Sequence, residues 1–391
     1  MTASGRRHLV LLGGGHAHLA VLAALARTPL PDWDVTLVSA APHLTYSGMV
    51  PGLLAGRYRL EDCRIALPPL AQAAGIRWLP GRCTGIDAAQ RRLTLAQSVT
   101  TVLDYDLLSI DTGGVMEPDA LEARMPGAAA HALPARPIDA LAEGWSHELA
   151  RMRRRAQASG SGPSVAVIGG GAAGIELVFA ARQGLLQAGM AGARLSLLTG
   201  GGPVAPGYPA GVRRQVERQL QRQGITLLPS ACTGIDADQV HMGTAGSLVC
   251  DLALIATGSM APSWLSGSGL DRGPQGHVAI NRFLQSTSHP EVFAAGDVAD
   301  RADHRYPRSG VHAVRAGPAL ALNLRRAASG QALQPHWPPQ HTLNLLSCGT
   351  GHAVASYGVF CAGGGWVWGW KDRIDRGFMQ RHRKPGGART A

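Results

Sequence analysis

The sequence predicts an α/β fold that contains the same short pattern twice. In the first copy, residues 8–12 form an apolar strand, Gly13, Gly14 and Gly15 form a turn, and residues 19–27 form a helix. In the second copy, the strand covers residues 164–168, the glycine-rich turn 169–174 and the helix 175–186. Glycines let the chain turn sharply, and they let a pyrophosphate approach the backbone at the positive helix N-terminus. Two such copies predict two Rossmann-like dinucleotide-binding domains.

Both copies depart from the usual fingerprint. Each leads to a further apolar strand, at residues 34–39 and 194–199. His18 stands where the third glycine of the first copy is expected. The second strands end at Ser39 and Thr199, where an acid ordinarily binds the ribose hydroxyls. Either hydroxyl is a candidate replacement for that acid. Without a carboxylate to repel a 2′-phosphate, both NADH and NADPH stay open as the second dinucleotide.

Three further apolar strands carry distinctive ends. The segments 105–113 and 251–258 both finish in Thr-Gly, at Thr112-Gly113 and Thr257-Gly258. Residues 292–297 form a short strand that finishes in Gly296-Asp297. An acid at that point can accept hydrogen bonds from the polyol linker of a flavin, a chain of hydroxyls that NAD lacks. We therefore expect FAD in the first unit.

Composition narrows the class of protein further. The chain has 391 residues, of which 45% are hydrophobic and 16% charged, so a disordered protein is excluded. A net charge of +11 suits nucleic acid, an anionic membrane or phosphate-rich ligands. No lysine-rich or aromatic-interleaved basic motif occurs, so we expect no nucleic-acid partner. The six cysteines form no C-x-x-C pair, which predicts no metal site, no disulfide scaffold and a cytoplasmic setting.

These motifs, in this order, resemble the FAD-dependent pyridine nucleotide–disulfide oxidoreductase superfamily. Gly-Gly-Gly-His-Ala-His at 13–18, Tyr-Ser-Gly-Met-Val-Pro-Gly at 46–52 and Trp-Gly-Trp-Lys-Asp at 368–372 resemble its branch like type II NADH dehydrogenases. They are closest to the form fused to selenophosphate synthetase, and the likeness runs from about residue 7 to 383. The resemblance implies an FAD-dependent NAD(P)H dehydrogenase that passes a hydride from nicotinamide to flavin and then electrons to an acceptor. A quinone is the first candidate for this acceptor, and a small protein and a selenium compound are the others.

The resemblance also implies roles for individual residues. The pyrophosphate of FAD would contact Gly13 and Gly15, with Ser39 at the adenosine ribose and Asp297 on the ribityl chain. Glu176 would face the nicotinamide end of NAD(P)H. No acid–base residue is expected, since the flavin supplies the chemistry. The full set of expected cofactor-binding residues is Gly13, Gly14, Gly15, His16, Ser39, Tyr46, Ser47, Thr112, Gly113, Gly169, Gly171, Ala172, Gly174, Glu176, Thr257, Gly258, Gly296 and Asp297.

The order of motifs implies interleaved domains. An FAD-binding domain would use residues 1–118 and 262–335, with an NAD(P)H-binding domain at 119–261 inserted between its parts. A C-terminal α/β unit with an amphipathic basic tail would cover residues 336–391, opened by a proline-rich linker.

Several residues leave alternatives open. No close cysteine pair follows the first helix. Cys348 fits one cysteine position of sulfide:quinone oxidoreductases, but it has no partner between residues 83 and 232, so we interpret it as a small buried residue. A sulfide:quinone-type enzyme and a low-turnover redox-sensing module remain alternative functions. His16 and His18 either line the flavin site or pack at the helix start. The segment 307–317, with His312 and Arg315, either opens a helix at the flavin edge or ends the domain.

The tail has two alternatives as well. Trp370, Ile374 and Phe378 fall on one helical face, with Trp366 and Trp368 nearby and Arg373, Arg376, Arg381, Arg383 and Lys384 around them. Such a stripe either lies on an anionic membrane or packs on its own domain or a homodimer partner. The protein is accordingly expected in the cytoplasm, either free or at the cytoplasmic face of a membrane.

Overall fold

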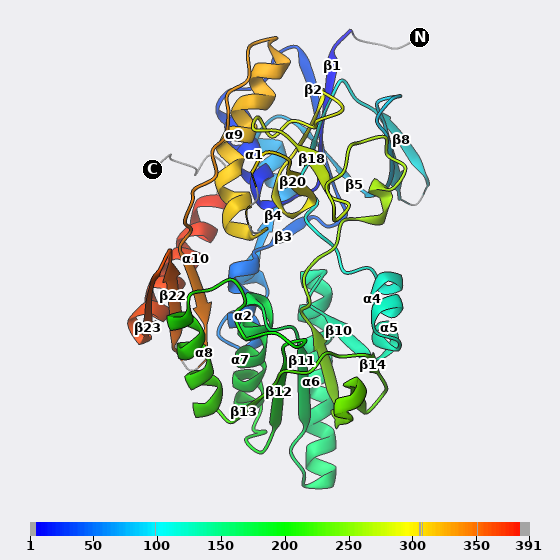
Figure 1. Cartoon of the computed structure of the whole chain (residues 1–391). Coiled ribbons are helices and arrows are strands. Elements are labelled where there is room, and N and C mark those ends of the chain that lie inside the picture. The colour runs from blue at the N-terminus through cyan, green and yellow to red at the C-terminus, as the bar shows by residue number, and fades with distance from the viewer. Residues whose placement is uncertain (1–4, 98, 305, 307, 350, 384–391) are drawn as a thin grey trace.

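The computed structural model describes residues 5–97, 99–304, 306, 308–349 and 351–383. Two lobes lie one above the other, and the C-terminal elements run along one side of both (Figure 1). The lower lobe comes from the middle of the chain, drawn green, and the upper lobe from segments on either side of it. The predicted α/β class is confirmed.

A five-stranded parallel sheet forms the centre of the upper lobe. Its strands run in the order β19 (Val292–Ala294), β9 (Leu107–Ile110), β1 (Arg7–Leu12), β2 (Trp33–Ser39) and β5 (Arg77–Pro80). Helix α1 (His16–Arg27) packs against α9 (Gly310–Ala328). Leu9, Val10 and Leu11 are completely buried, as expected for a parallel strand that is covered on both faces.

The lower lobe repeats this arrangement. Its sheet has the order β10 (Ala132–Pro134), β17 (Leu252–Ile255), β11 (Ser164–Ile168), β12 (Arg194–Leu198) and β13 (Ile225–Leu228), all parallel. The surrounding helices are α6 (Ile138–Ser159), α7 (Ala172–Gln187) and α8 (Ala210–Arg222). β11, β12 and β17 thus correspond to β1, β2 and β9 of the upper sheet.

Smaller elements fill the connections. Each lobe carries a three-stranded antiparallel sheet. In the upper lobe it precedes β9 and consists of β6 (Arg82–Asp87), β7 (Arg92–Ala96) and β8 (Thr101–Asp104); in the lower lobe it precedes β17 and consists of β14 (Gly234–Ile235), β15 (Gln239–His241) and β16 (Ser247–Val249). The remaining elements of this part are β3 (His43–Thr45), β4 (Arg64–Ala66), β18 (Val278–Ile280), β20 (Ala299–Arg301), α2 (Val50–Leu54), α3 (Leu67–Ala73), α4 (Pro118–Arg124), α5 (Ala128–His131), η1 (Ser47–Met49), η2 (Glu61–Cys63), η3 (Gly243–Ala245), η4 (Ser263–Leu265) and η5 (Gly296–Val298).

The C-terminal unit is an antiparallel sheet with one long helix. Strands β21 (Asn344–Ser347), β22 (Ala353–Tyr357) and β23 (Phe360–Gly364) precede α10 (Gly365–Arg383). The expected apolar stripe is divided: Trp370 and Ile374 are exposed, whereas Phe378 is buried in the core of the upper lobe. Lys384 and the rest of the predicted tail lie outside the described residues. No described helix has the length and apolarity needed to cross a membrane.

Candidate functional site: two pockets that meet at one ion pair

A first pocket lies beyond the carboxyl ends of β1, β2 and β9, where parallel α/β sheets bind their ligands. Ten of the residues expected to bind FAD line it: Gly13, Gly14, Gly15, His16, Ser39, Ser47, Thr112, Gly113, Gly296 and Asp297. Tyr46 does not line this pocket. Its ring stacks on Phe378 at 4.3 Å between centroids, and its hydroxyl donates to Asp375.

The glycine turn is required by close backbone contacts. Gly13 has a φ of +100°, and a Cβ there would lie 2.4 Å from the carbonyl oxygen of Asp111. Gly15 forms the N-cap of α1, and a Cβ on it would meet the Asp111 carboxyl group. Only glycine fits both positions, which places the backbone N–H groups at the start of α1 next to the pocket.

Several polar atoms around the first pocket are buried without a partner among the described residues. Asp297 accepts a hydrogen bond from Nη2 of Arg136 at 2.9 Å through Oδ2, but its Oδ1 has no partner. Thr112 Oγ1 and His16 Nε2 are also buried and unpartnered. Since buried polar groups are normally hydrogen-bonded, these atoms indicate a polar ligand between them.

A second pocket lies at the corresponding end of the lower sheet. It is lined by Gly169, Gly171, Ala172, Thr257 and Gly258, together with Thr199. Gly171 is the N-cap of α7, and a Cβ on it would meet nothing within 4 Å, so this position faces open space. Gly174 serves the packing of the helix instead. A Cβ there would lie 1.8 Å from the Gly169 carbonyl oxygen, so this glycine allows α7 to approach the turn.

The two pockets share Arg136 and Asp297, which line both. Arg136 follows β10 and Asp297 follows β19, the two strands at corresponding edges of the two sheets. Their ion pair therefore marks the place where ligands of the two lobes would meet. Sequence reasoning missed Arg136, because it lies in a loop without a motif and 161 positions from its partner.

Both hydroxyls that the sequence offered as replacements for the ribose-binding acid already make hydrogen bonds within the protein. Ser39 donates to the carbonyl of Ala41 at 2.7 Å and accepts from the Trp78 indole at 2.9 Å. Thr199 donates to the carbonyl of Gly202 at 2.6 Å. Among the described lining residues of the second pocket, Asp297 is the one carboxylate, and it is accompanied by Arg124, Arg136 and Arg308.

The two histidines of the first turn differ in role. His18 is fully buried, with Nδ1 at 2.5 Å from the Gly13 carbonyl and Nε2 at 2.8 Å from Ser109 Oγ. Burial lowers the pKa of His18 to about 4, so the ring is a neutral packing group. His16 lines the first pocket, and burial followed by the charge of Arg136 lowers its pKa to about 4 as well.

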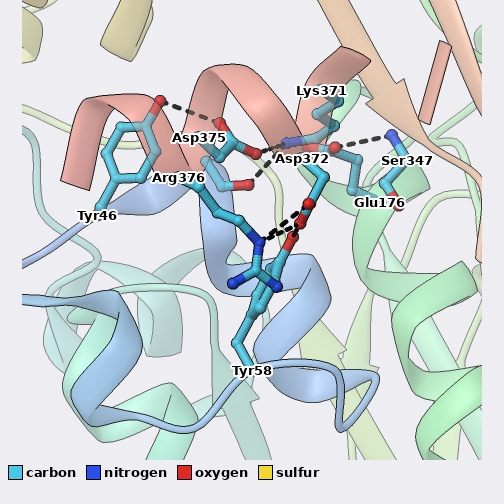
Figure 2. A network of polar contacts seen from close by, with 9 residues as sticks. Tyr46, Tyr58, Glu176, Ser347, Lys371, Asp372, Asp375 and Arg376 are labelled. Carbon is cyan, nitrogen blue, oxygen red and sulfur yellow. Dashed lines mark hydrogen bonds and ion pairs between the residues drawn. The ribbon is translucent and has the colours of Figure 1, made fainter. Parts of the chain in front are cut away.

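Glu176 takes part in a buried network rather than lining the second pocket (Figure 2). Its carboxylate accepts from the backbone N–H of Ser347 at 2.9 Å, and burial raises its pKa. Lys371 of α10 donates to Asp375 at 2.8 Å and to the Gly48 carbonyl at 2.7 Å. Burial alone would lower the pKa of Lys371, but Glu176 and Asp375 together raise it. The network therefore joins both lobes to the C-terminal helix.

The surface end of this network is also visible in Figure 2. Asp372 accepts from Arg376 Nε at 2.9 Å and from the Tyr58 hydroxyl. Tyr46 connects the other side, donating to Asp375 at 3.2 Å. Tyr46, expected among the cofactor-binding residues, thus contacts α10 directly.

The described cysteines are all free, and none belongs to a metal-binding group among the residues that the structure describes. Cys348 is completely buried, and burial raises the pKa of its thiol. A buried protonated thiol is a poor nucleophile, so Cys348 fits the interpretation of a packing residue. At the other expected segment, α9 begins at Gly310, and Gly310 and Ala313 line the first pocket; Pro307 lies outside the described residues.

Known proteins resemble this chain over nearly its whole length. The structure of a sulfide:quinone oxidoreductase from Aquifex aeolicus matches with a TM-score of 0.80 at 18% identity, covering 98% of this chain and 93% of that one. The structure of NDH2 from Plasmodium falciparum in complex with NADH matches with a TM-score of 0.80 at 14% identity, covering 98% and 99%. At these identities the likeness establishes the fold.

Proteins that are similar in sequence include further quinone reductases. A demethylphylloquinone reductase from Synechocystis is 22% identical over 368 residues, which is 90% of this chain and 87% of the relative. A sulfide-quinone reductase from Aquifex aeolicus is 30% identical over 107 residues. That match spans only 24% of the length of the relative. A match to a glutathione reductase from Nostoc spans 32% of the length of that reductase.

The profile of the pyridine nucleotide-disulphide oxidoreductases matches residues 7–317, from β1 into the middle of α9. That span contains both glycine turns, both pockets and the shared ion pair. It covers well over half of the chain. The expected superfamily is thereby confirmed, and the chain belongs to the pyridine nucleotide-disulphide oxidoreductase family, whose members use FAD and NAD(P)H.

Proposed function

We propose that this protein oxidises NADH or NADPH and delivers the electrons to a quinone, with FAD as its bound cofactor. The observation that carries the proposal is that two dinucleotide-type pockets share one ion pair, Arg136–Asp297. In this assignment the first pocket takes FAD and the second takes NAD(P)H. Bound FAD would supply the chemistry, accepting a hydride and passing on electrons.

The residues of the first pocket fit FAD. The unpartnered Oδ1 of Asp297 would accept a hydrogen bond from a ribityl hydroxyl, and Arg136 balances the charge of the same carboxylate. The N-terminus of α1 would bind the diphosphate through the backbone N–H groups that do not already donate to Asp111. Thr112 would complete the polar contacts through its unpartnered hydroxyl.

The second pocket fits NAD(P)H in the same terms. Gly171 leaves open space at the N-terminus of α7, and the buried Thr257 hydroxyl lacks a partner among the described residues. The protein's own contribution is to hold two ligands against each other at Arg136–Asp297. No side chain is assigned as an acid or a base.

A quinone is the proposed acceptor because several similar proteins bear names of quinone reductases. A disulfide substrate is disfavoured, since the sequence has no close cysteine pair after the first helix. A sulfide substrate is disfavoured by the burial of Cys348. NADH and NADPH remain equal candidates, because neither a ribose-binding acid nor a 2′-phosphate site stands out at Thr199.

We also propose contact with an anionic membrane surface. Two groups of exposed apolar residues lie in the C-terminal unit, and we call them together the apolar face. One lies at the β22–β23 turn (Tyr357, Val359 and Phe360), and the other lies at every fourth position of α10 (Trp366, Trp370 and Ile374). Phe360 is 74% and Trp366 64% exposed, and Arg373 lies on the same helix. Aromatic side chains beside arginines suit the boundary between lipid headgroups and acyl chains.

An anaerobic spectral titration tests the main proposal. The purified protein should contain FAD, and NADH or NADPH should bleach its absorbance; a quinone should then restore it. Bleaching by sulfide without NAD(P)H would instead support the sulfide:quinone alternative. Absence of steady NAD(P)H oxidation with added quinone would contradict the proposal and favour a redox-sensing module.

A further inference from the structure

Asp111 is a buried carboxyl group that the proposed function does not use. It follows β9 directly, is 2% exposed and lines the first pocket. Its Oδ2 accepts the backbone N–H of His18 at 2.8 Å, so it occupies the N-terminal end of α1. A Cβ on Gly15 would lie 2.4 Å from its Cγ and 2.5 Å from its Oδ1, so the carboxyl group lies directly behind the turn.

This position creates a conflict between two anions. The N-terminus of α1 is where the diphosphate of FAD would bind, because the backbone N–H groups of the first helical turn and the helix dipole favour negative charge there. An ionised Asp111 would occupy the same helix end. Like charges at one site favour protonation of the group that can accept a proton. The diphosphate stays ionised at neutral pH, whereas a carboxyl group can be neutralised.

The titratable and charged groups around Asp111 lie on neighbouring elements. On α1, burial keeps the pKa of both His16 and His18 at about 4, so both rings are neutral above pH 6. On η5, Asp297 is held in an ion pair with Arg136. On α9, the apolar Ala313 faces the Gly296 turn. Burial raises the pKa of Asp111 to about 7, opposed by the N–H groups of His18 and Ala17 and assisted by Asp297.

The turn itself does not require this acid. In the lower lobe the corresponding residue after β17 is Ala256. A Cβ on Gly169 would lie 2.4 Å from the Ala256 carbonyl oxygen, just as one on Gly13 would lie 2.4 Å from that of Asp111. The same backbone contact is thus made in the lower lobe without a carboxyl group, so the carboxyl group of Asp111 is not needed for it.

We propose that Asp111 takes up one proton from water when FAD binds, so that it meets the diphosphate as a neutral carboxyl group and not as a second anion. The inference rests on the proposed placement of FAD in the first pocket. Linkage then sets the direction of the pH effect: binding coupled to uptake of one proton weakens about tenfold for each pH unit above the pKa of the free protein. FAD should therefore be held most tightly below pH 7 and be released progressively in alkali.

Retention of FAD by the holoprotein tests this. Samples are diluted and ultrafiltered at pH values from 6 to 9, and released FAD is measured by fluorescence. We expect the wild type to release much more FAD at the alkaline end, with the steepest change above pH 7. Asp111→Asn, which keeps an oxygen for the His18 N–H, should show a nearly flat profile. Titration calorimetry of the wild-type apoprotein at pH 8 in buffers of different ionisation enthalpy should show uptake of close to one proton.

The ways in which the proposal can fail give different results. A wild-type profile that stays flat, or no proton uptake, overturns the role of Asp111, and this result does not depend on any variant. A variant profile as steep as the wild type also overturns it. Asp297→Ala tests the pocket separately: if that variant keeps its FAD at every pH, the placement of FAD is wrong. Thermal unfolding of each apoprotein, with Asp111→Ala as a second variant that copies Ala256, identifies misfolding.

Discussion

The two glycine turns have the same backbone conformation at their N-caps and different side chains around them. Gly15 and Gly171, the N-caps of α1 and α7, both have φ −76° and ψ −179°. The lower turn uses Gly174 to bring the helix against the Gly169 carbonyl. The upper turn has His18 at that place, and the ring binds the Gly13 carbonyl and Ser109.

The difference shows that a third glycine is one of two ways to let the helix pack closely against the turn. In the lower lobe, the helix reaches the strand because no side chain intervenes. In the upper lobe, a neutral imidazole fills the gap and satisfies the carbonyl that the close approach would otherwise cover. Asp111 accompanies His18 where the lower lobe has Ala256, so the upper turn carries two buried polar side chains that the lower one lacks.

The largest expected effect comes from Gly174→Val. Any Cβ there would overlap the Gly169 carbonyl at 1.8 Å, so the lower turn must open. We expect NAD(P)H to lose its ability to bleach the flavin, while FAD stays bound in the upper lobe. Absorbance spectra before and after NADH addition measure both. Loss of FAD together with a normal response of the remaining flavin would reverse the assignment of the two turns.

The upper turn should respond to His18→Gly in a different way. Losing the ring removes two hydrogen bonds and leaves a cavity, which costs about 2–4 kcal/mol of unfolding free energy. Ser109→Ala, a milder control, should cost about 1 kcal/mol. Thermal unfolding measures both. If glycine is tolerated at no cost, the upper turn does not depend on the ring.

The same position has a pH signature. Since burial lowers the pKa of His18 from its ordinary 6.5 to about 4, the unfolded chain binds a proton that the folded chain does not in this range. The wild type should therefore lose stability as the pH falls from 6.5 toward 4. His18→Asn should lose less over the same interval, as measured by thermal unfolding at each pH.

The two sheets differ at their corresponding edges, since Asp297 follows β19 in the upper lobe and Arg136 follows β10 in the lower lobe. Asp297→Ala should weaken FAD binding by about 1–3 kcal/mol, roughly 5- to 150-fold, because a ribityl hydroxyl loses its acceptor. The exposed Asp104→Ala serves as a control without effect on FAD content. Full flavin occupancy in the Asp297 variant would contradict its role.

A smaller effect is expected from alanine at the N-cap glycines, where the effect on folding can be distinguished from the effect on ligand binding. Gly171→Ala adds a methyl group to open space, so the unfolding temperature should stay the same while NAD(P)H binding weakens about tenfold, near 1.4 kcal/mol. Gly15→Ala, its counterpart, should lower both stability and FAD content because the methyl group meets Asp111. Equal behaviour of the two variants would mean that both turns are equally crowded.

The smallest effect concerns the apolar face of α10 and the β22–β23 turn. Trp370→Glu should reduce cosedimentation with anionic vesicles, and salt should do the same, since each arginine near such a surface contributes about 1 kcal/mol. Point substitutions are preferred to truncation, because α10 also carries the buried Lys371 and Phe378. If the wild type stays in the supernatant at low salt, the helix has a purely structural role.

The sequence by itself determined the class of fold, both turns, the strands that follow them and the family, because strand periodicity and glycine spacing are local properties of the chain. The tertiary structure decided which distant side chains pair. His18 pairs with Ser109, Arg136 with Asp297 and Lys371 with Gly48, and these partners are 91, 161 and 323 positions apart in the sequence. It also turned Glu176 toward Ser347 and divided the α10 stripe between solvent and core. Such contacts depend on how separate elements pack, and no local pattern records which distant side chain will fill a given gap.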